Sequence, residues 1–158
     1  MRKQGLFWSS LLSLLFALWL PVGAAPNVSA PAFEKILGHY YQIQEALAQD
    51  TTAGVEKAAQ AIVRVASEAQ RTSAKKGPDY AAISRAATGL QGKSLEQARQ
   101  QFFELSKPII AELKRNPAIK KQAYAYNCSM AKKSWVQADK GIRNPYYGKS
   151  MLKCGEPL

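Results

Sequence analysis

Apolar residues recur along most of the chain with alternating steps of three and four, the spacing of one face of an amphipathic helix. Four such stripes follow one another: Phe33, Ile36, Tyr40, Ile43 and Leu47; Val55, Ala58, Ile62, Val65 and Ala69; Tyr80, Ile83, Ala87 and Leu90; Leu95, Ala98, Phe102, Leu105 and Ile109. We interpret these residues as the core-facing sides of four helices and not as a cofactor site.

The connections between the four stripes are short, at about residues 49–53, 71–78 and 91–94. Short connections favour antiparallel neighbours. The sequence therefore predicts an all-α fold, an up-and-down four-helix bundle.

Two signals mark the ends of the fourth predicted helix. Ser94 is followed three residues later by Gln97, which is a capping-box pattern and predicts the helix start. Pro108 lies inside the stripe and is expected to kink the helix or end it, because proline removes a backbone hydrogen bond. Asn116 and Pro117 predict the final stop.

The pattern changes in the last part of the chain, residues 121–158. Tyr124, Tyr126 and Cys128 alternate with smaller or polar residues as in a short strand, and turn-forming residues follow. We expect a short irregular, β-containing C-terminal tail that packs on the bundle. Such a segment is too short to be stable alone and needs a covalent or metal staple.

The N-terminus has the order of a secretory signal peptide, expected over residues 1–24. Arg2 and Lys3 precede an apolar run over residues 6–20, and Val22-Gly23-Ala24 offers a small-residue cleavage pattern. The apolar run is shorter than the roughly 20 residues of a membrane-spanning helix. We expect a periplasmic protein with no stable membrane anchor after cleavage.

The expected mature chain consists of a linker, residues 25–31, and a single helical domain, residues 32–158. Loss of two basic residues with the leader lowers the formal net charge from +11 to +9. Basic residues are spread over the chain, which favours a solvated surface able to meet an acidic protein partner. Nucleic acid is not an expected partner of an exported chain.

The sulfur atoms of the expected mature chain all lie between Cys128 and Cys154. An oxidising compartment favours pairing of the two cysteines. A disulfide would close a loop of 26 residues and stabilise the fold by roughly 3–4 kcal/mol on the chain-entropy model. In this interpretation, the methionines only fill gaps.

A second interpretation takes four sulfurs together as a metal site: Cys128, Met130, Met151 and Cys154. Thiolate and thioether sulfurs are soft donors that suit Cu(I), the candidate cofactor. The two interpretations compete, because oxidised cysteines cannot donate thiolates. A site gated by the redox state of the cysteines would reconcile them, and so would a metal site formed only by Met130 and Met151, with or without His39.

The turn Asn144-Pro145-Tyr146-Tyr147-Gly148 is expected to reverse the chain and return Cys154 towards Cys128. Trp135 is expected either to cover the sulfur site or to fill the small core of the tail.

An enzyme is not expected. His39 lies at the border of the first apolar stripe and is interpreted as a boundary residue and not as a ligand. We find no spacing typical of a catalytic triad, a phosphate-binding loop or a haem attachment site.

The tail sequence NCSMAKKSWVQADKGIRNPYYGKSMLKCG resembles the domain-of-unknown-function family thirty-three forty-seven. The segments YYQIQEALAQDT and ARQQFFELSKPII resemble its earlier helices, so the likeness covers nearly all of the mature chain. That domain occurs alone in exported bacterial proteins, or fused to periplasmic adaptor subunits of copper/silver-type heavy-metal efflux pumps.

The resemblance implies a periplasmic helical domain that handles copper or a related metal, with the family's sulfur positions at Cys128, Met130, Met151 and Cys154. Ser129 stands where the family usually has proline, and the segment before Trp135 is shorter than is usual. We therefore expect a copper-binding or metal-resistance accessory protein whose partner is an efflux adaptor or another periplasmic protein. The alternative is a disulfide-stabilised interaction module without a metal site.

Overall fold

The computed structural model describes residues 29–72, 77–120 and 123–158. The expected leader and its cleavage site lie outside the described residues. Over the described part of the chain, no helix has both the length and the apolar character needed to cross a bilayer.

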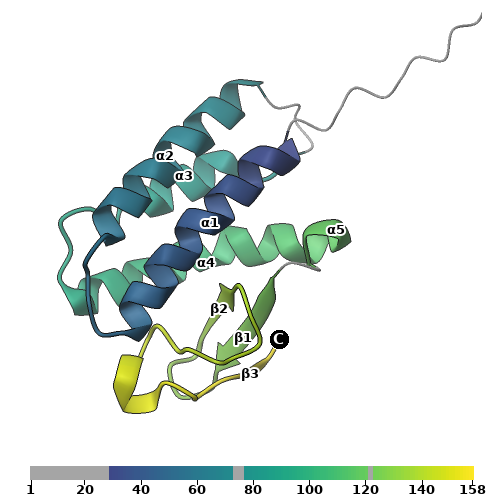
Figure 1. Cartoon of the computed structure of the whole chain (residues 1–158). Helices are drawn as coiled ribbons and strands as arrows, with labels where there is room; N and C mark the ends of the chain where they lie inside the picture. Colours follow the sequence, from purple (N-terminus) through teal and green to yellow (C-terminus); the bar gives the residue numbers. More distant parts are fainter. Residues whose placement is uncertain (1–28, 73–76, 121–122) are drawn as a thin grey trace, which may run out of the picture.

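Helices make up the first two thirds of the described chain, and a small sheet follows them (Figure 1). The helices are α1 (Ser29–Ala48), α2 (Val55–Thr72), α3 (Tyr80–Thr88), α4 (Leu95–Arg115) and the single-turn α5 (Pro117–Lys120). Successive helices from α1 to α4 contact one another, and α1 also contacts α4. The prediction of a mostly helical chain with a β-containing tail is confirmed.

The tail forms a three-stranded antiparallel sheet in the order β2-β1-β3. Its elements are β1 (Tyr124–Cys128), β2 (Lys133–Gln137), the 3-10 helix η1 (Gly148–Met151) and β3 (Glu156–Pro157). Tyr126 of β1 lies opposite Trp135 of β2. β2 packs against α4 and α1, and Figure 1 shows the sheet beneath these helices.

The apolar stripes predicted from the sequence form the core. Every residue of the first stripe is fully buried, as are Ala98, Phe102, Leu105 and Ile109 of the fourth. Val65 and Leu95 are only half-buried. Leu90 is buried although α3 ends at Thr88, so its burial comes from the connection to α4 and not from a helix.

Pro31 and Pro108 lie within the helices α1 and α4. α1 begins at Ser29, inside the segment expected to be linker, and Pro31 fits its first turn because the missing N–H has no helical acceptor there. α4 continues through Pro108 to Arg115, so Pro108 does not end it. Buried Leu105 and Ile109 hold the helix to the core on both sides of the proline.

The helix ends of α4 follow the sequence signals. Ser94 and Gln97 form the predicted capping box. Asn116 is the C-cap, and its N–H donates to the Glu112 carbonyl. Pro117 then opens α5, because proline is suited to the first helical position.

A buried hydrogen-bond network joins the sheet to the helices. Ser106 donates to the Phe102 carbonyl (2.9 Å), which leaves its oxygen to accept from the Tyr40 hydroxyl (2.7 Å). The N–H of Val136 donates to the Tyr40 oxygen (3.1 Å). Tyr40 therefore links α1, α4 and β2 through one buried oxygen, and burial raises its pKa well above the usual value.

Replacing Tyr40 by phenylalanine is expected to lower the free energy of unfolding by about 1–3 kcal/mol, because Val136 N–H and Ser106 lose a buried partner. Urea denaturation followed by circular dichroism measures this change. Tyr147→Phe is the matched control, since Tyr147 forms a hydrogen bond through its backbone N–H and none through its hydroxyl among the described residues, and it should cost less than about 0.5 kcal/mol. Equal effects of the two variants would contradict the role of the Tyr40 hydroxyl.

Candidate functional site

The structure brings the two cysteines together. Cys128 is the last residue of β1, and Cys154 lies between η1 and β3. Their Sγ atoms are 3.0 Å apart. Cys128 is 0% exposed, whereas Cys154 is partly exposed. The expectation that the tail folds back so that these two residues meet agrees with this geometry.

Asn144 organises the turn that returns the chain to Cys128. It is fully buried, and its side-chain oxygen accepts from the backbone N–H groups of Tyr146 (2.8 Å) and Tyr147 (3.3 Å). Its side-chain amide donates to the Cys154 carbonyl (2.9 Å). One side chain therefore fixes both the turn and the backbone that carries Cys154.

The predicted turn also needs Gly148. Its φ is +57°, and a Cβ at this position would lie 1.8 Å from an Asp50 oxygen. Its N–H donates to the Asn144 carbonyl (3.1 Å). Glycine is therefore required both by the left-handed backbone and by the close approach to the α1–α2 connection.

Arg99 of α4 fastens this turn to the helices. Its guanidinium donates to the carbonyls of Pro145 and Leu47 (both 3.0 Å) and forms an ion pair with Asp50 (2.5 Å). The hydrogen bond from Arg99 lowers the pKa of the Asp50 carboxyl, which also accepts from the Lys149 N–H (3.2 Å). The Arg99 side chain thus joins α4 to the end of α1 and to the turn at residues 144–148.

An aromatic cluster lies beside the sulfur pair. Trp135 is fully buried, stacks on Tyr126 (centroids 5.6 Å apart) and meets Tyr146 edge-on (6.0 Å). Its Nε1–H donates to the Gln137 side chain (3.0 Å). A Cβ on Gly155 would lie 2.6 Å from the indole, so the backbone after Cys154 rests directly against the ring. Trp135 fills the core of the tail, one of the two roles expected for it.

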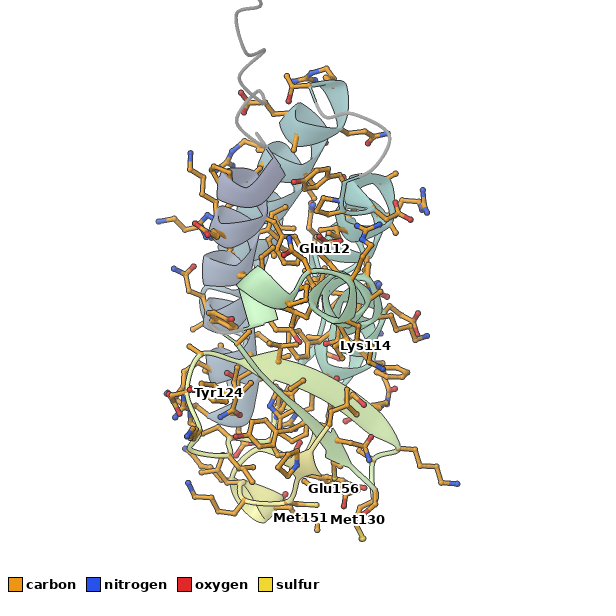
Figure 2. The ribbon with its side chains drawn as sticks, turned by 90° about the vertical axis from the view of Figure 1, so that its right-hand side faces the viewer. Glu112, Lys114, Tyr124, Met130, Met151 and Glu156 are labelled. Carbon is orange, nitrogen blue, oxygen red and sulfur yellow. The ribbon has the colours of Figure 1, made fainter. Side chains whose placement is uncertain are left out.

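The methionines are more exposed than the cysteines. Met130 follows β1 in the turn to β2 and is 63% exposed, and Met151 ends η1 and is half-buried. Figure 2 shows both residues at the same end of the molecule. The structure thus places the two thiols in contact with each other. The two thioethers lie at the same end of the molecule as the thiols.

The two thiols differ electrostatically. Burial opposes ionisation of Cys128, but hydrogen bonds from the Cys154 thiol, the Ala131 N–H and the Asn144 side chain outweigh it and lower the Cys128 pKa. The pKa of Cys154 is raised, chiefly by its hydrogen bond to Cys128. The hydrogen bonds at the buried sulfur therefore favour the thiolate form of Cys128.

Charged residues lie close to the sulfur-bearing residues in the sequence. Lys132, Lys149 and Lys153 are exposed, and the charge of exposed Glu156 contributes to the raised pKa of Cys154. The net positive charge of the whole chain, +11, favours acidic partner surfaces.

His39 does not lie in this site. It is half-buried on α1, where its ring is hydrogen-bonded to the side chain of Gln42 (3.3 Å). The described residues contain no group of three or more His, Cys, Asp or Glu side chains placed to hold a metal ion.

Sequence reasoning missed three residues that position the pair. Gln137 is fully buried, and its amide donates to the carbonyls of Asp139 and Gly141. Arg99 carried no signal, since a basic residue on a helix is usually solvated. Gly155 had a weak signal, because glycine directly after a cysteine permits close approach of the backbone to a neighbour.

Comparisons with protein-family models, with curated proteins and with solved structures found no match. The family resemblance drawn from the tail motif therefore stays a prediction.

Proposed function

We propose that the protein is a periplasmic heavy-metal-binding accessory protein that holds Cu(I) through the sulfurs of its C-terminal tail. The supporting observation is the contact between the Sγ atoms of Cys128 and Cys154, 3.0 Å apart. Two adjacent thiols are a donor pair that suits a soft ion. Met130 and Met151 are the further donors in this proposal, and their exposure leaves them able to adjust to an ion.

The helices serve as the scaffold for this site, and the proposal assigns them no catalytic role. An up-and-down arrangement of α1 to α4 is part of the proposal and is supported by their successive contacts. The net positive charge of the chain supports an acidic partner, for which we propose an adaptor of a heavy-metal efflux system or another periplasmic protein. Periplasmic location rests on the signal-peptide pattern of residues 1–24.

Replacing both Met130 and Met151 by alanine is expected to lower the Cu(I) affinity of the reduced protein by at least about 10-fold, because two soft donors are lost. Stability should change little, since neither residue is buried in the core. Anaerobic competition with a chromophoric Cu(I) chelator measures the affinity, and thermal unfolding of the metal-free protein measures the stability.

The control is the double variant Met130→Leu, Met151→Leu, which keeps the apolar bulk and removes only the sulfur. It should lose as much affinity as the alanine variant. Full Cu(I) affinity in the leucine variant would show that the methionine sulfurs are not ligands. Failure of the reduced wild-type protein to bind Cu(I) would overturn the metal proposal as a whole.

The second candidate function is a disulfide-stabilised interaction module. The observed 3.0 Å between the sulfurs exceeds a disulfide bond by only about 1 Å, so a small movement would form it. Exposed Lys132, Lys149 and Lys153 would then meet an acidic partner. Thiol counting on the protein isolated from the periplasm separates the candidates: no free thiol, with no Cu(I) binding after reduction, supports the module.

A further inference from the structure

The two sulfurs of the pair differ in how they can be reached from solvent. Cys128 is 0% exposed and belongs to the core, whereas Cys154 is partly exposed and only packs against it. Attack on a disulfide requires access to one sulfur, and the rate depends on which sulfur is reached. An external thiol therefore meets Cys154 first.

The buried sulfur is suited to leave as a thiolate. The N–H of Ala131 points at the Cys128 sulfur (3.5 Å). Cys128 is also held in place by the sheet, where it lies opposite Lys133 of β2. A fixed donor facing a sulfur stabilises the charge that develops when its S–S bond breaks.

Cys154 is held in a way that leaves its sulfur accessible. Its N–H donates to the Met151 carbonyl (3.0 Å), and its carbonyl accepts from Asn144 (2.9 Å). Both bonds use only the backbone atoms of Cys154. The side chain can therefore carry a bulky adduct with little change in the turn.

We infer that the oxidised pair is a thiol–disulfide exchange site that is entered at Cys154, with Cys128 as the leaving sulfur. A thiolate of an external dithiol reductant attacks the Cys154 sulfur. A new S–S bond forms there, the Cys154–Cys128 bond breaks, and its electron pair stays on Cys128. The second thiolate of the reductant then attacks its partner sulfur and releases Cys154, so the reductant leaves as a disulfide. This inference depends on the pairing of the two cysteines and not on copper.

The first experiment uses the oxidised full chain with a metal chelator present. It is treated with reduced glutathione, quenched with acid and digested for mass spectrometry. The expected mixed disulfide lies on Cys154, with none on Cys128. Adducts shared equally between the two cysteines, or found mainly on Cys128, would overturn the inference.

The second experiment compares Cys128→Ser with Cys154→Ser. Oxidised glutathione is expected to modify Cys154 in the first variant about 100-fold faster than Cys128 in the second, because a buried thiol reacts only after local opening. The same reactions in guanidinium give the intrinsic rates, and the difference should vanish there. Similar rates for the two folded variants would contradict the assignment.

Both experiments are run without metal, so their results do not depend on whether the protein binds copper. If either serine variant does not fold, the adduct map of the wild-type chain still decides the question. A wild-type chain that forms no internal disulfide with oxidised glutathione would also overturn the inference.

Discussion

Replacing Trp135 by alanine is expected to lower the free energy of unfolding by about 3–5 kcal/mol, because a fully buried indole is removed from the core of the tail. The ring stacks on Tyr126 and meets Tyr146 edge-on, so both neighbours lose contact area when it is deleted. Guanidinium denaturation followed by far-ultraviolet circular dichroism measures the loss. The backbone at Gly155 also loses its support, so Cys154 should become more reactive to thiol reagents.

Trp135→Phe is the matched control for this effect. It keeps an aromatic ring and removes the indole N–H, whose acceptor Gln137 still receives a hydrogen bond from the Arg143 N–H (3.1 Å). The expected cost is therefore less than half that of the alanine variant. A loss below about 1 kcal/mol in Trp135→Ala would show that the indole does not hold the tail together.

The helical part of the fold could be predicted because each helix buries one periodic face. Residues such as Phe33 and Phe102 are fully buried at the positions that the three-four spacing assigns to the core. The exact helix ends could not be predicted in the same way. Leu90 continues the third stripe and is buried, yet α3 ends at Thr88, because burial in a connecting segment gives the same pattern as burial in a helix.

β2 could not be predicted from alternation. Trp135, Val136 and Gln137 are consecutive and all buried, since α4 and α1 pack against the strand while Trp135 contacts the rest of the tail. Strands covered on both faces lose the period-two signal. Gln137 also breaks the apolar pattern, although its buried amide is paired within the tail.

The meeting of the cysteines could be predicted from turn chemistry. Asn144 and Gly148 are residues that reverse a chain, and a reversal between Cys128 and Cys154 brings them together. The difference in their burial could not be predicted, because it depends on how the sheet packs on α4. The contacts of Arg99 could not be predicted either, because they join segments that are far apart in sequence.

Replacing Asn144 by aspartate is expected to lower the free energy of unfolding by about 4 kcal/mol at pH 7. The change puts an anion at a fully buried position and replaces the amide donor to the Cys154 carbonyl with a second acceptor. Burial raises the pKa of a carboxyl by about 3 units in comparable sites, at about 1.36 kcal/mol for each unit. Urea denaturation of variant and wild type over a range of pH values measures the difference.

The pH dependence of stability distinguishes the cost of a buried charge from the cost of lost hydrogen bonds. With an unfolded pKa of about 3.9 and a raised pKa in the folded state, the penalty should be complete near pH 7 and should fade as the pH approaches 4. Below that pH the protonated carboxyl can again donate to the Cys154 carbonyl while its other oxygen accepts from Tyr146 N–H, as the amide does. Asn144→Ala, which adds no charge, should lose stability by an amount independent of pH. A penalty for Asn144→Asp that does not change with pH would show that Asn144 is open to water and does not fix the backbone beside Cys154.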